Sequence, residues 1–278
     1  MADCWRYYNH AMLPTCAPHE SVDPAPLRDG SIWAPVQGGR TPLLARWTSD
    51  WDCGTPTNWW YCIKDTPFDI ASVNAKKRYG IRKGCEHFDV QLIDPLRYVE
   101  QLFAVQVAAF STYPTAYRPH TDAESFRQSV ARWSGQKVFA AFEKASGRLC
   151  AYAQVIEYRD YANLAVLKAD PAFEKFQVNA AILFGILEHY KERLSGCFYI
   201  ADGERNILHE TAFQDYLERT FGFRKAYCKL HLQYRPGIGF LIKLAYPFQS
   251  ITRKLDFKFA KQLSAILKME AFTRGRSE

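Results

Sequence analysis

The sequence predicts a mixed α/β fold in which a mostly antiparallel central sheet is flanked by helices. Residues 137–171 read as three consecutive strands joined by short turns, and residues 177–234 then alternate as helix, strand, helix and strand. Hydrophobic residues make up 48% of the 278-residue chain, enough to bury a large core. We therefore expect three parts: an N-terminal segment (1–87), a central domain (88–235) and a tail (236–278).

The N-terminal segment combines residues that break regular structure with large apolar anchors. Residues 1–70 contain eight of the fourteen prolines and six of the seven tryptophans. We expect this segment to be irregular but packed on the body. Its end, "NWWYCIKDTPFDI", has the aromatic and β-branched content of a strand that stops at residues 65–67.

A cluster of cations follows in "AKKRYGIRKG", residues 75–84. The segment is expected to form a helix that begins at Ala75 and ends at Gly84. Three interpretations are open: a solvated face, a binding site for a phosphate-bearing ligand, or a nucleic-acid surface. The body is nearly neutral, since residues 236–278 alone hold eight Lys/Arg against three Asp/Glu, and this argues against nucleic acid. The candidate substrate-binding residues here are Lys76, Lys77, Arg78 and Arg82.

The central domain is expected to begin with a strand at 88–94, followed by helices at 96–113 and near 121–133. The second of these helices should begin at the Thr121/Asp122 cap. The apolar positions of "QVNAAILFGILEHYKERL" (177–194) follow helical spacing, and "CFYIADG" (197–203) is a short apolar strand.

This order of elements over residues 88–235 resembles the GNAT acyltransferase superfamily. The stretch "YLERTFGFRKAY" (216–227) resembles that family's helix-to-strand junction, in which an aromatic-Gly-Phe turn follows the last helix. In addition, "KKRYGIRKG" followed by "FDVQLID" is similar to the Arg/Lys-rich stretch before the first strand of Fem-type peptidyltransferases and related proteins of polysaccharide loci. The resemblance implies an N-acyltransferase that acts on an amine of a cell-envelope or capsular saccharide precursor.

Two departures from the family pattern bear on the donor and the acid. The resemblance places donor-binding residues at Lys168, Gln177, Val178, Asn179 and Ala180, but Val178 occupies the first glycine position of the phosphate loop. Acyl-coenzyme A stays a candidate donor although its glycine loop is absent. The missing loop favours two other interpretations, a tRNA-linked aminoacyl donor or a lost donor site. The family's tyrosine acid falls at Glu218, and the nearest tyrosine is Tyr216.

N-acyl transfer needs a base for the amine proton and a donor for the oxyanion. Glu157 and Asp202, which end two predicted strands, are the candidate bases; each could equally be a solvated or ion-paired carboxylate. His209 could be a base or could begin a helix, and Tyr216 could be an acid or a core residue. The polar loop after Asp202 offers three possible substrate contacts, or is a plain surface loop: Glu204, Arg205 and Asn206.

The tail sets apolar residues on one helical stripe with Arg253, Lys254, Lys261 and Lys268 opposite them. The stripe consists of Phe248, Ile251, Leu255, Phe259, Leu263 and Ile266. Such a helix either docks on its own domain or lies on an anionic membrane.

We expect a cytoplasmic protein, possibly peripheral at the inner membrane face, with no metal, because no leader segment and no Cys/His cluster at metal-ligand spacing is present in the sequence. The expected acceptor is a small or lipid-linked saccharide, and the only nucleic acid expected is a tRNA-linked donor. Two alternatives stay open: a non-catalytic protein of the same fold that binds a phosphosugar or an anionic membrane, and an RNA-binding module. The sequence does not determine the oligomeric state.

Overall fold

The computed structural model describes residues 4–36, 38–113, 118–207, 212–249 and 258–275. It confirms the mixed α/β class, with helices flanking a mostly antiparallel sheet of ten strands among these residues. The strands follow the order β1-β2-β3-β10-β4-β9-β8-β7-β6-β5. Their bounds are β1 Trp5–Tyr8, β2 Ala11–Pro14, β3 Leu44–Ser49, β4 Trp59–Lys64, β5 Phe88–Ile93, β6 Lys137–Glu143, β7 Leu149–Glu157, β8 Tyr161–Ala169, β9 Tyr199–Glu204 and β10 Arg224–Tyr234.

The chain forms two compact units. The core unit consists of Cys62–Gly203 and Ala212–Arg224, and the terminal unit consists of Met1–Tyr61, Glu204–Thr211 and Lys225–Glu278. The chain passes from one unit to the other within β4, β9 and β10. These units divide the chain at other points than residues 87 and 235, so the three-part division stays a prediction.

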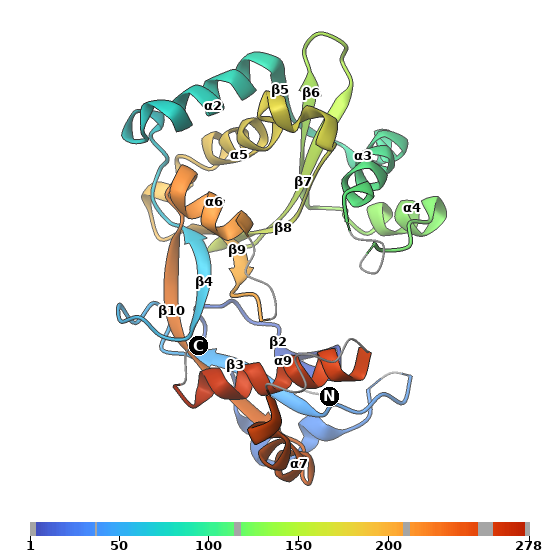
Figure 1. Ribbon diagram of the computed structural model, residues 1–278, viewed down its shortest axis with the longest axis vertical. Helices are drawn as coiled ribbons and strands as arrows, with labels where there is room; N and C mark the ends of the chain where they lie inside the picture. The colour runs from blue at the N-terminus through green and yellow to red at the C-terminus, as the bar shows by residue number, and fades with distance from the viewer. Residues whose placement is uncertain (1–3, 37, 114–117, 208–211, 250–257, 276–278) are drawn as a thin grey trace. The chain divides into compact units, whose positions relative to one another are not determined.

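In the core unit, helices cover both faces of the strands β5 to β8 (Figure 1). Helix α5 (Val178–His189) lies on one face, with α2 (Ala75–His87) packed on it, and α3 (Val99–Ser111) and α4 (Ala123–Ala131) lie on the other. Because both faces are covered, seven consecutive residues of β7 are buried, from Leu149 to Val155. The predicted antiparallel arrangement of β6, β7 and β8 is confirmed.

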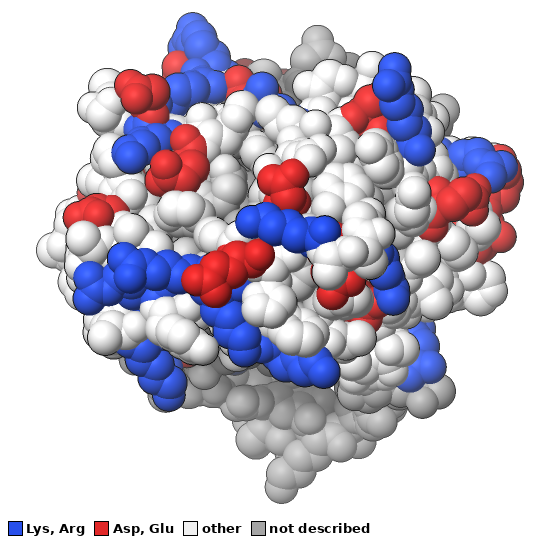
Figure 2. All heavy atoms as spheres, turned by 90° about the horizontal axis from the view of Figure 1, so that it is seen from above, with Lys and Arg blue, Asp and Glu red and all other residues white. Residues whose placement is uncertain are grey.

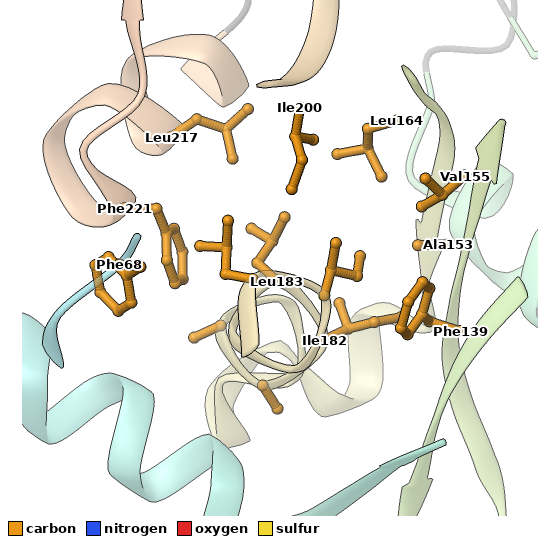
Figure 3. Packing of buried hydrophobic residues seen from close by; sticks show 14 of the residues in the cluster. Phe68, Phe139, Ala153, Val155, Leu164, Ile182, Leu183, Ile200, Leu217 and Phe221 are labelled. Carbon is orange, nitrogen blue, oxygen red and sulfur yellow. The ribbon is translucent and has the colours of Figure 1, made fainter. Parts of the chain in front are cut away.

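The core packs around α5, which is buried on nearly every side (Figure 3). The predicted stripe of Leu183, Ile186 and Leu187 is buried, but so are Val178 and Ile182 on other sides of the helix, because α2 covers it as well. Side chains from distant elements meet there, and burying each large one stabilises the unit by about 1.5–3 kcal/mol. The labelled examples are Phe68, Phe139, Val155, Leu164, Ile200, Leu217 and Phe221.

The basic segment forms α2, as predicted, and begins with a side-chain cap in which Asn74 Oδ1 accepts from the Lys77 N–H at 3.0 Å. The prediction that Gly84 ends this helix is wrong, since the helix continues to His87. Gly84 instead permits close packing: a Cβ there would lie 2.7 Å from the carbonyl oxygen of Gln177. The glycine is a contact point between helices and not a terminator.

The terminal unit is built on β1, β2, β3 and β10. The N-terminal segment is more regular than predicted, because β1 and β2 form an antiparallel pair and β3 pairs antiparallel with β10. Its aromatic residues pack as expected, with Trp5 and Trp47 in edge contact at 6.2 Å. The short helix α1 spans Ala25–Arg28.

The C-terminal helices of the terminal unit are α7 (Ile238–Ala245), the single turn η7 (Tyr246–Phe248) and α9 (Lys258–Thr273). Helix α9 packs on the unit through Met269 and Phe272, which join Trp59 and Leu230 in one cluster. Of the predicted stripe, Leu263 and Ile266 pack against α7, whereas Ile251 and Leu255 lie outside the described residues. No helix within the described ranges is long and apolar enough to span a bilayer.

Candidate active site

The parallel strands β8 and β9 stay paired over only three residue pairs. Their register joins Tyr161, Ala162 and Asn163 to Tyr199, Ile200 and Ala201. Beyond Asn163, β8 continues to Ala169 with β7 as its registered partner. The two strands therefore stop pairing beyond Asn163 and Ala201.

A β-bulge lies at the point of separation. Val155 of β7 pairs with Leu164 and the adjacent Gln154 pairs with Val166, so Ala165 is an extra residue in β8. A β-bulge interrupts the regular hydrogen bonding between two strands and changes the direction in which nearby backbone groups point. The backbone around Ala165 is thus the first part of β8 that β9 does not pair with.

Asp202 is the first residue of β9 beyond the paired part. Since side chains alternate along a strand, it shares the face of Ile200, which packs in the core around α5. Desolvation in these surroundings raises the pKa of Asp202 to about 7, against an opposing hydrogen bond with the side chain of Gln214 from α6 (Ala212–Phe221). This carboxyl exchanges its proton near neutral pH, as a general base requires.

Glu157, the other predicted base, is held in an ion-paired cluster. Its carboxylate accepts from Tyr190 Oη at 2.9 Å and from an Arg193 nitrogen at 2.6 Å, and Lys137 Nζ lies 3.6 Å away. Although burial alone would raise its pKa, the hydrogen bonds and the two cations lower it below its usual value. This environment favours the ion-paired alternative over a base near neutral pH.

Of the other two predicted catalytic residues, the structure describes Tyr216. His209 lies outside the described residues. Tyr216 on α6 packs its ring against Phe213 and Phe221, at 6.4 and 5.7 Å between ring centroids. Desolvation raises the pKa of Tyr216 to about 12, so its hydroxyl stays protonated.

The predicted donor loop meets α2. Gln177 has a left-handed backbone (φ 67°), Val178 is fully buried, and Gly80 and Gly84 of α2 approach Gln177 closely. The Oδ1 atom of Asn179 is buried without a hydrogen-bond partner. A diphosphate needs backbone N–H groups that it can approach, and these residues do not fit that requirement.

Lys168, predicted beside that loop, lies at the other side of the sheet. Its ammonium sits over the rings of Phe110 and Tyr113, at 4.7 and 5.7 Å from their centroids. Both rings belong to the end of α3 and the residues after it. The structure therefore does not bring Lys168 together with residues 177–180.

The cations of α2 fall into two groups. Lys77 donates to the carbonyl of Arg219, and Lys83 donates to the carbonyl of Lys175 at 3.0 Å, so both bind ends of neighbouring helices. Lys76, Arg78 and Arg82 form no ion pair among the described residues. Figure 2, seen from the end at which α2 lies in Figure 1, has cations and carboxylates interspersed on the described surface.

The predicted polar loop after Asp202 is largely structured in the terminal unit. Glu204 still belongs to β9 and pairs with Arg46. The Arg205 guanidinium lies between the rings of Trp60 and Phe272, at 4.4 and 4.1 Å. Asn206 is exposed.

Sequence reasoning missed a polar pocket of about 350 Å³ on the α3/α4 face of the core unit. At its wall, Tyr152 Oη donates to Gln106 Oε1 at 3.1 Å, and the buried Gln154 donates to Gln136. A glutamine within an otherwise apolar strand was the signal that could have revealed it. Asp202 faces the opposite side of the sheet. The pocket is lined by Gln106, His120, Thr121, Asp122, Ser125, Phe126, Ser129, Trp133, Tyr152, Gln154 and Val166.

No group of three His, Cys, Asp or Glu residues within the described ranges is arranged to hold a metal ion. The candidate site consists of Asp202, Gln214 and the separated edges of β8 and β9.

An antiparallel run of strands, a parallel pair that separates at a bulge, and helices on both faces define a GNAT-like fold. No family model matches the sequence, and no curated protein matches it. The fold is similar to that of solved structures. One is the C-terminal domain (DUF2156) of a protein from Agrobacterium fabrum described as a lysylphosphatidylglycerol synthetase. The TM-score is 0.52 at 11% identity, covering 86% of this chain and 82% of that one.

A second similar structure is a conserved protein of unknown function from Bacteroides thetaiotaomicron, with a TM-score of 0.50 at 12% identity, covering 80% of this chain and 78% of that one. A structure of FemX matches with a TM-score of 0.49 at 9% identity, over 67% of this chain and 63% of that one. At these identities the likeness shows the fold alone. The GNAT-like architecture expected from the order of elements is confirmed.

Proposed function

We propose that this protein is an acyltransferase that moves an acyl group onto an amine, with Asp202 as the general base. The observation that carries the proposal is a carboxyl group with a pKa of about 7 at the point where β8 and β9 separate. A base with a pKa near the working pH is ionised in a large fraction of molecules and still accepts a proton readily.

The proposed donor is an aminoacyl ester, as on a tRNA, in preference to acyl-coenzyme A. The start of α5 is packed against α2 and carries Val178 where a diphosphate would need a glycine. In the reaction the amine nitrogen attacks the ester carbonyl, Asp202 takes the proton that the amine loses, and Asp202 returns this proton to the ribose oxygen as the ester C–O bond breaks. Backbone N–H groups at the Ala165 bulge are the proposed hydrogen-bond donors to the oxyanion.

The proposed acceptor is an amine of a cell-envelope or capsular saccharide precursor. Asp202 and α2 lie on the α5 side of the sheet, so the acceptor is proposed to bind on that side and not in the α3/α4 pocket. Lys76, Arg78 and Arg82 on α2 offer charge for a phosphate on such a precursor. In this proposal they act as a substrate-binding set, and Lys77 serves the structure.

The test compares wild type with Asp202→Asn in a transfer assay that uses labelled aminoacyl-tRNA or labelled acetyl-coenzyme A with a panel of amino-sugar acceptors. We expect product from aminoacyl-tRNA, a rate that rises through pH 7, and a loss of about 100-fold or more in Asp202→Asn. Asp215→Asn, an exposed carboxylate on the same helix as Gln214, is the matched control and should retain full activity. A variant as active as wild type would remove Asp202 from the mechanism.

A second candidate is a non-catalytic protein of this fold that binds a phosphosugar. The close packing of α2 on the start of α5 favours it, because the usual donor site is covered. It predicts saturable binding of a phosphorylated amino sugar in calorimetry, with no transfer from either donor.

A further inference from the structure

Helix α7 and the turn after it expose large apolar side chains on one side. Phe240, Leu241, Leu244 and Phe248 are 66, 58, 56 and 58% exposed. We refer to these four side chains as the α7 apolar surface. They lie within nine residues of chain, so they form one concentrated surface.

The opposite side of the same segment is firmly packed. Ile242 and Tyr246 are buried against Leu267 and Ala271 of α9. The Arg274 guanidinium covers the Tyr246 ring at 4.0 Å. The helix is therefore fixed in place by one side, and the side that carries the α7 apolar surface is exposed.

The other exposed large apolar residues lie singly or in a pair along the chain, as at Tyr8, Tyr79 and Tyr158, and at Leu92 with Leu96. Single exposed apolar side chains are ordinary on a protein surface. A concentrated set on one fixed helix marks a surface that meets a partner or a lipid phase.

The charge of the neighbouring sequence indicates which partner the α7 apolar surface meets. From Lys229 to Lys254 the chain contains five Lys and Arg residues and no Asp or Glu. Lys243 lies within α7 itself, and Arg235 shortly precedes it. Apolar side chains flanked by cations are the pattern of a helix that rests on an anionic bilayer.

We propose that the α7 apolar surface enters the interfacial layer of an anionic membrane, with the neighbouring cations at the lipid headgroups. The sequence left two alternatives for the stripe that continues into α9, docking on its own domain or contact with an anionic membrane. The described part of α9 uses Leu267, Met269, Ala271 and Phe272 for packing, so α7 is the lipid-facing element. A role in bringing the enzyme to a lipid-linked acceptor rests on the proposed function, whereas the membrane binding itself does not.

The experiment is vesicle sedimentation of the full chain at moderate salt, with phosphatidylcholine vesicles that contain or lack 30% phosphatidylglycerol. The test variant combines Leu241→Gln, Leu244→Gln and Phe248→Gln. The control combines Leu92→Gln and Leu96→Gln, two exposed leucines of the core unit. We expect wild type and control to bind the anionic vesicles, and the test variant to bind at least about tenfold more weakly.

Neutral vesicles should bind wild type about tenfold more weakly than anionic ones. Asp202→Asn should bind vesicles as wild type does, which separates this proposal from the catalytic one. Equal binding by wild type and the test variant would overturn the proposal. It would also be overturned if wild type dimerised without lipid and the test variant did not, because the surface would then be an interface between two copies.

Discussion

Asp202 lies within β9 and Glu157 ends β7, and their surroundings shift their pKa values in opposite directions. Burial of Asp202 favours its neutral form, and the single hydrogen bond with Gln214 opposes this only in part. Glu157 also loses water, but Tyr190, Lys137 and Arg193 stabilise its charge. Their positions in the sequence made the two residues equivalent candidates for the general base. Their pKa values differ because cationic partners stabilise the charge of Glu157, whereas burial dominates at Asp202.

The raised pKa of Asp202 makes a prediction about stability. The folded protein binds this proton up to about pH 7, whereas the unfolded chain releases it near pH 4, so the contribution of Asp202 to stability falls as pH rises through this window. Asp202→Asn removes the titration. We expect the free energy of unfolding of the variant to gain about 1–3 kcal/mol relative to wild type between pH 4.5 and 8, measured by urea denaturation. Asp215→Asn should follow wild type, and a variant that also follows wild type would contradict the shifted pKa.

Gly84 provides a second prediction at a single residue. In Gly84→Ala the new Cβ would meet the Gln177 carbonyl oxygen at 2.7 Å and the Ala181 nitrogen at 3.1 Å, both backbone atoms that cannot move independently. We expect a loss of about 1–3 kcal/mol in the free energy of unfolding, despite the better helix propensity of alanine.

Gly80→Ala is the matched control, because its Cβ would meet the Oε1 end of the Gln177 side chain at 3.3 Å, and that side chain can turn away. This variant should be neutral or more stable by up to about 1 kcal/mol. Equal effects of the two substitutions would mean that α2 does not pack on α5 at Gly84.

At the scale of elements, the Glu157 cluster joins the end of β7 to the end of α5 and the turn after it. Glu157→Gln leaves Arg193 and Lys137 without their carboxylate, and we expect a loss of about 1–3 kcal/mol at pH 7. Because the folded pKa of Glu157 is lowered, this contribution is present above the unfolded pKa near 4.5 and is lost as pH falls through the folded pKa. Urea denaturation of wild type and Glu157→Gln at pH 7 and pH 3 tests this, and the difference between their free energies of unfolding should be smaller at pH 3. Glu188→Gln, in a more exposed pair with Lys191, should change stability by less than about 0.5 kcal/mol at either pH.

Elements with a periodic apolar pattern could be predicted from the sequence, including β6 to β8, α5 and the Asp122 cap of α4. The end of α2 could not, because a glycine inside a helix and a glycine after it look alike until the neighbouring helix is known. The α3/α4 pocket was missed for a related reason. Gln106 and Gln154 meet only through pairing of distant segments, and each alone is an ordinary polar residue.

The candidate site was predictable only in part. Asp202 was chosen for its position after an apolar strand, but its raised pKa depends on burial against α6, which no local pattern reveals. Glu204 and Arg205 followed the same positional argument, and instead contact Arg46, Trp60 and Phe272. A rule based on strand ends cannot distinguish these cases, because the partner of each side chain lies far away in the sequence.

For the molecule as a whole, the charge distribution predicts how a phosphorylated ligand binds. Replacing Lys76, Arg78 and Arg82 with alanine should weaken a phosphorylated amino sugar about tenfold at low salt, with the difference shrinking as salt rises. Calorimetric titration with the phosphorylated amino sugar at low and at high salt measures this difference in affinity. The control replaces three cations elsewhere in the core unit, Arg97, Arg132 and Lys191, so that the net charge changes equally. If both triple variants lost the same affinity, the effect would come from net charge and not from α2.

The pairing of β3 with β10 has a consequence for synthesis of the chain. Ser49 of β3 and His231 of β10 lie 182 residues apart and share a hydrogen bond of 2.7 Å. At roughly 5–20 residues per second, a ribosome needs on the order of 10–40 s to make the intervening chain. During that time β3 lacks its antiparallel partner β10, while nearly all of the core unit is being made. Chaperones that bind exposed aromatic segments therefore have a defined interval in which to protect this protein, and that interval ends when β10 emerges.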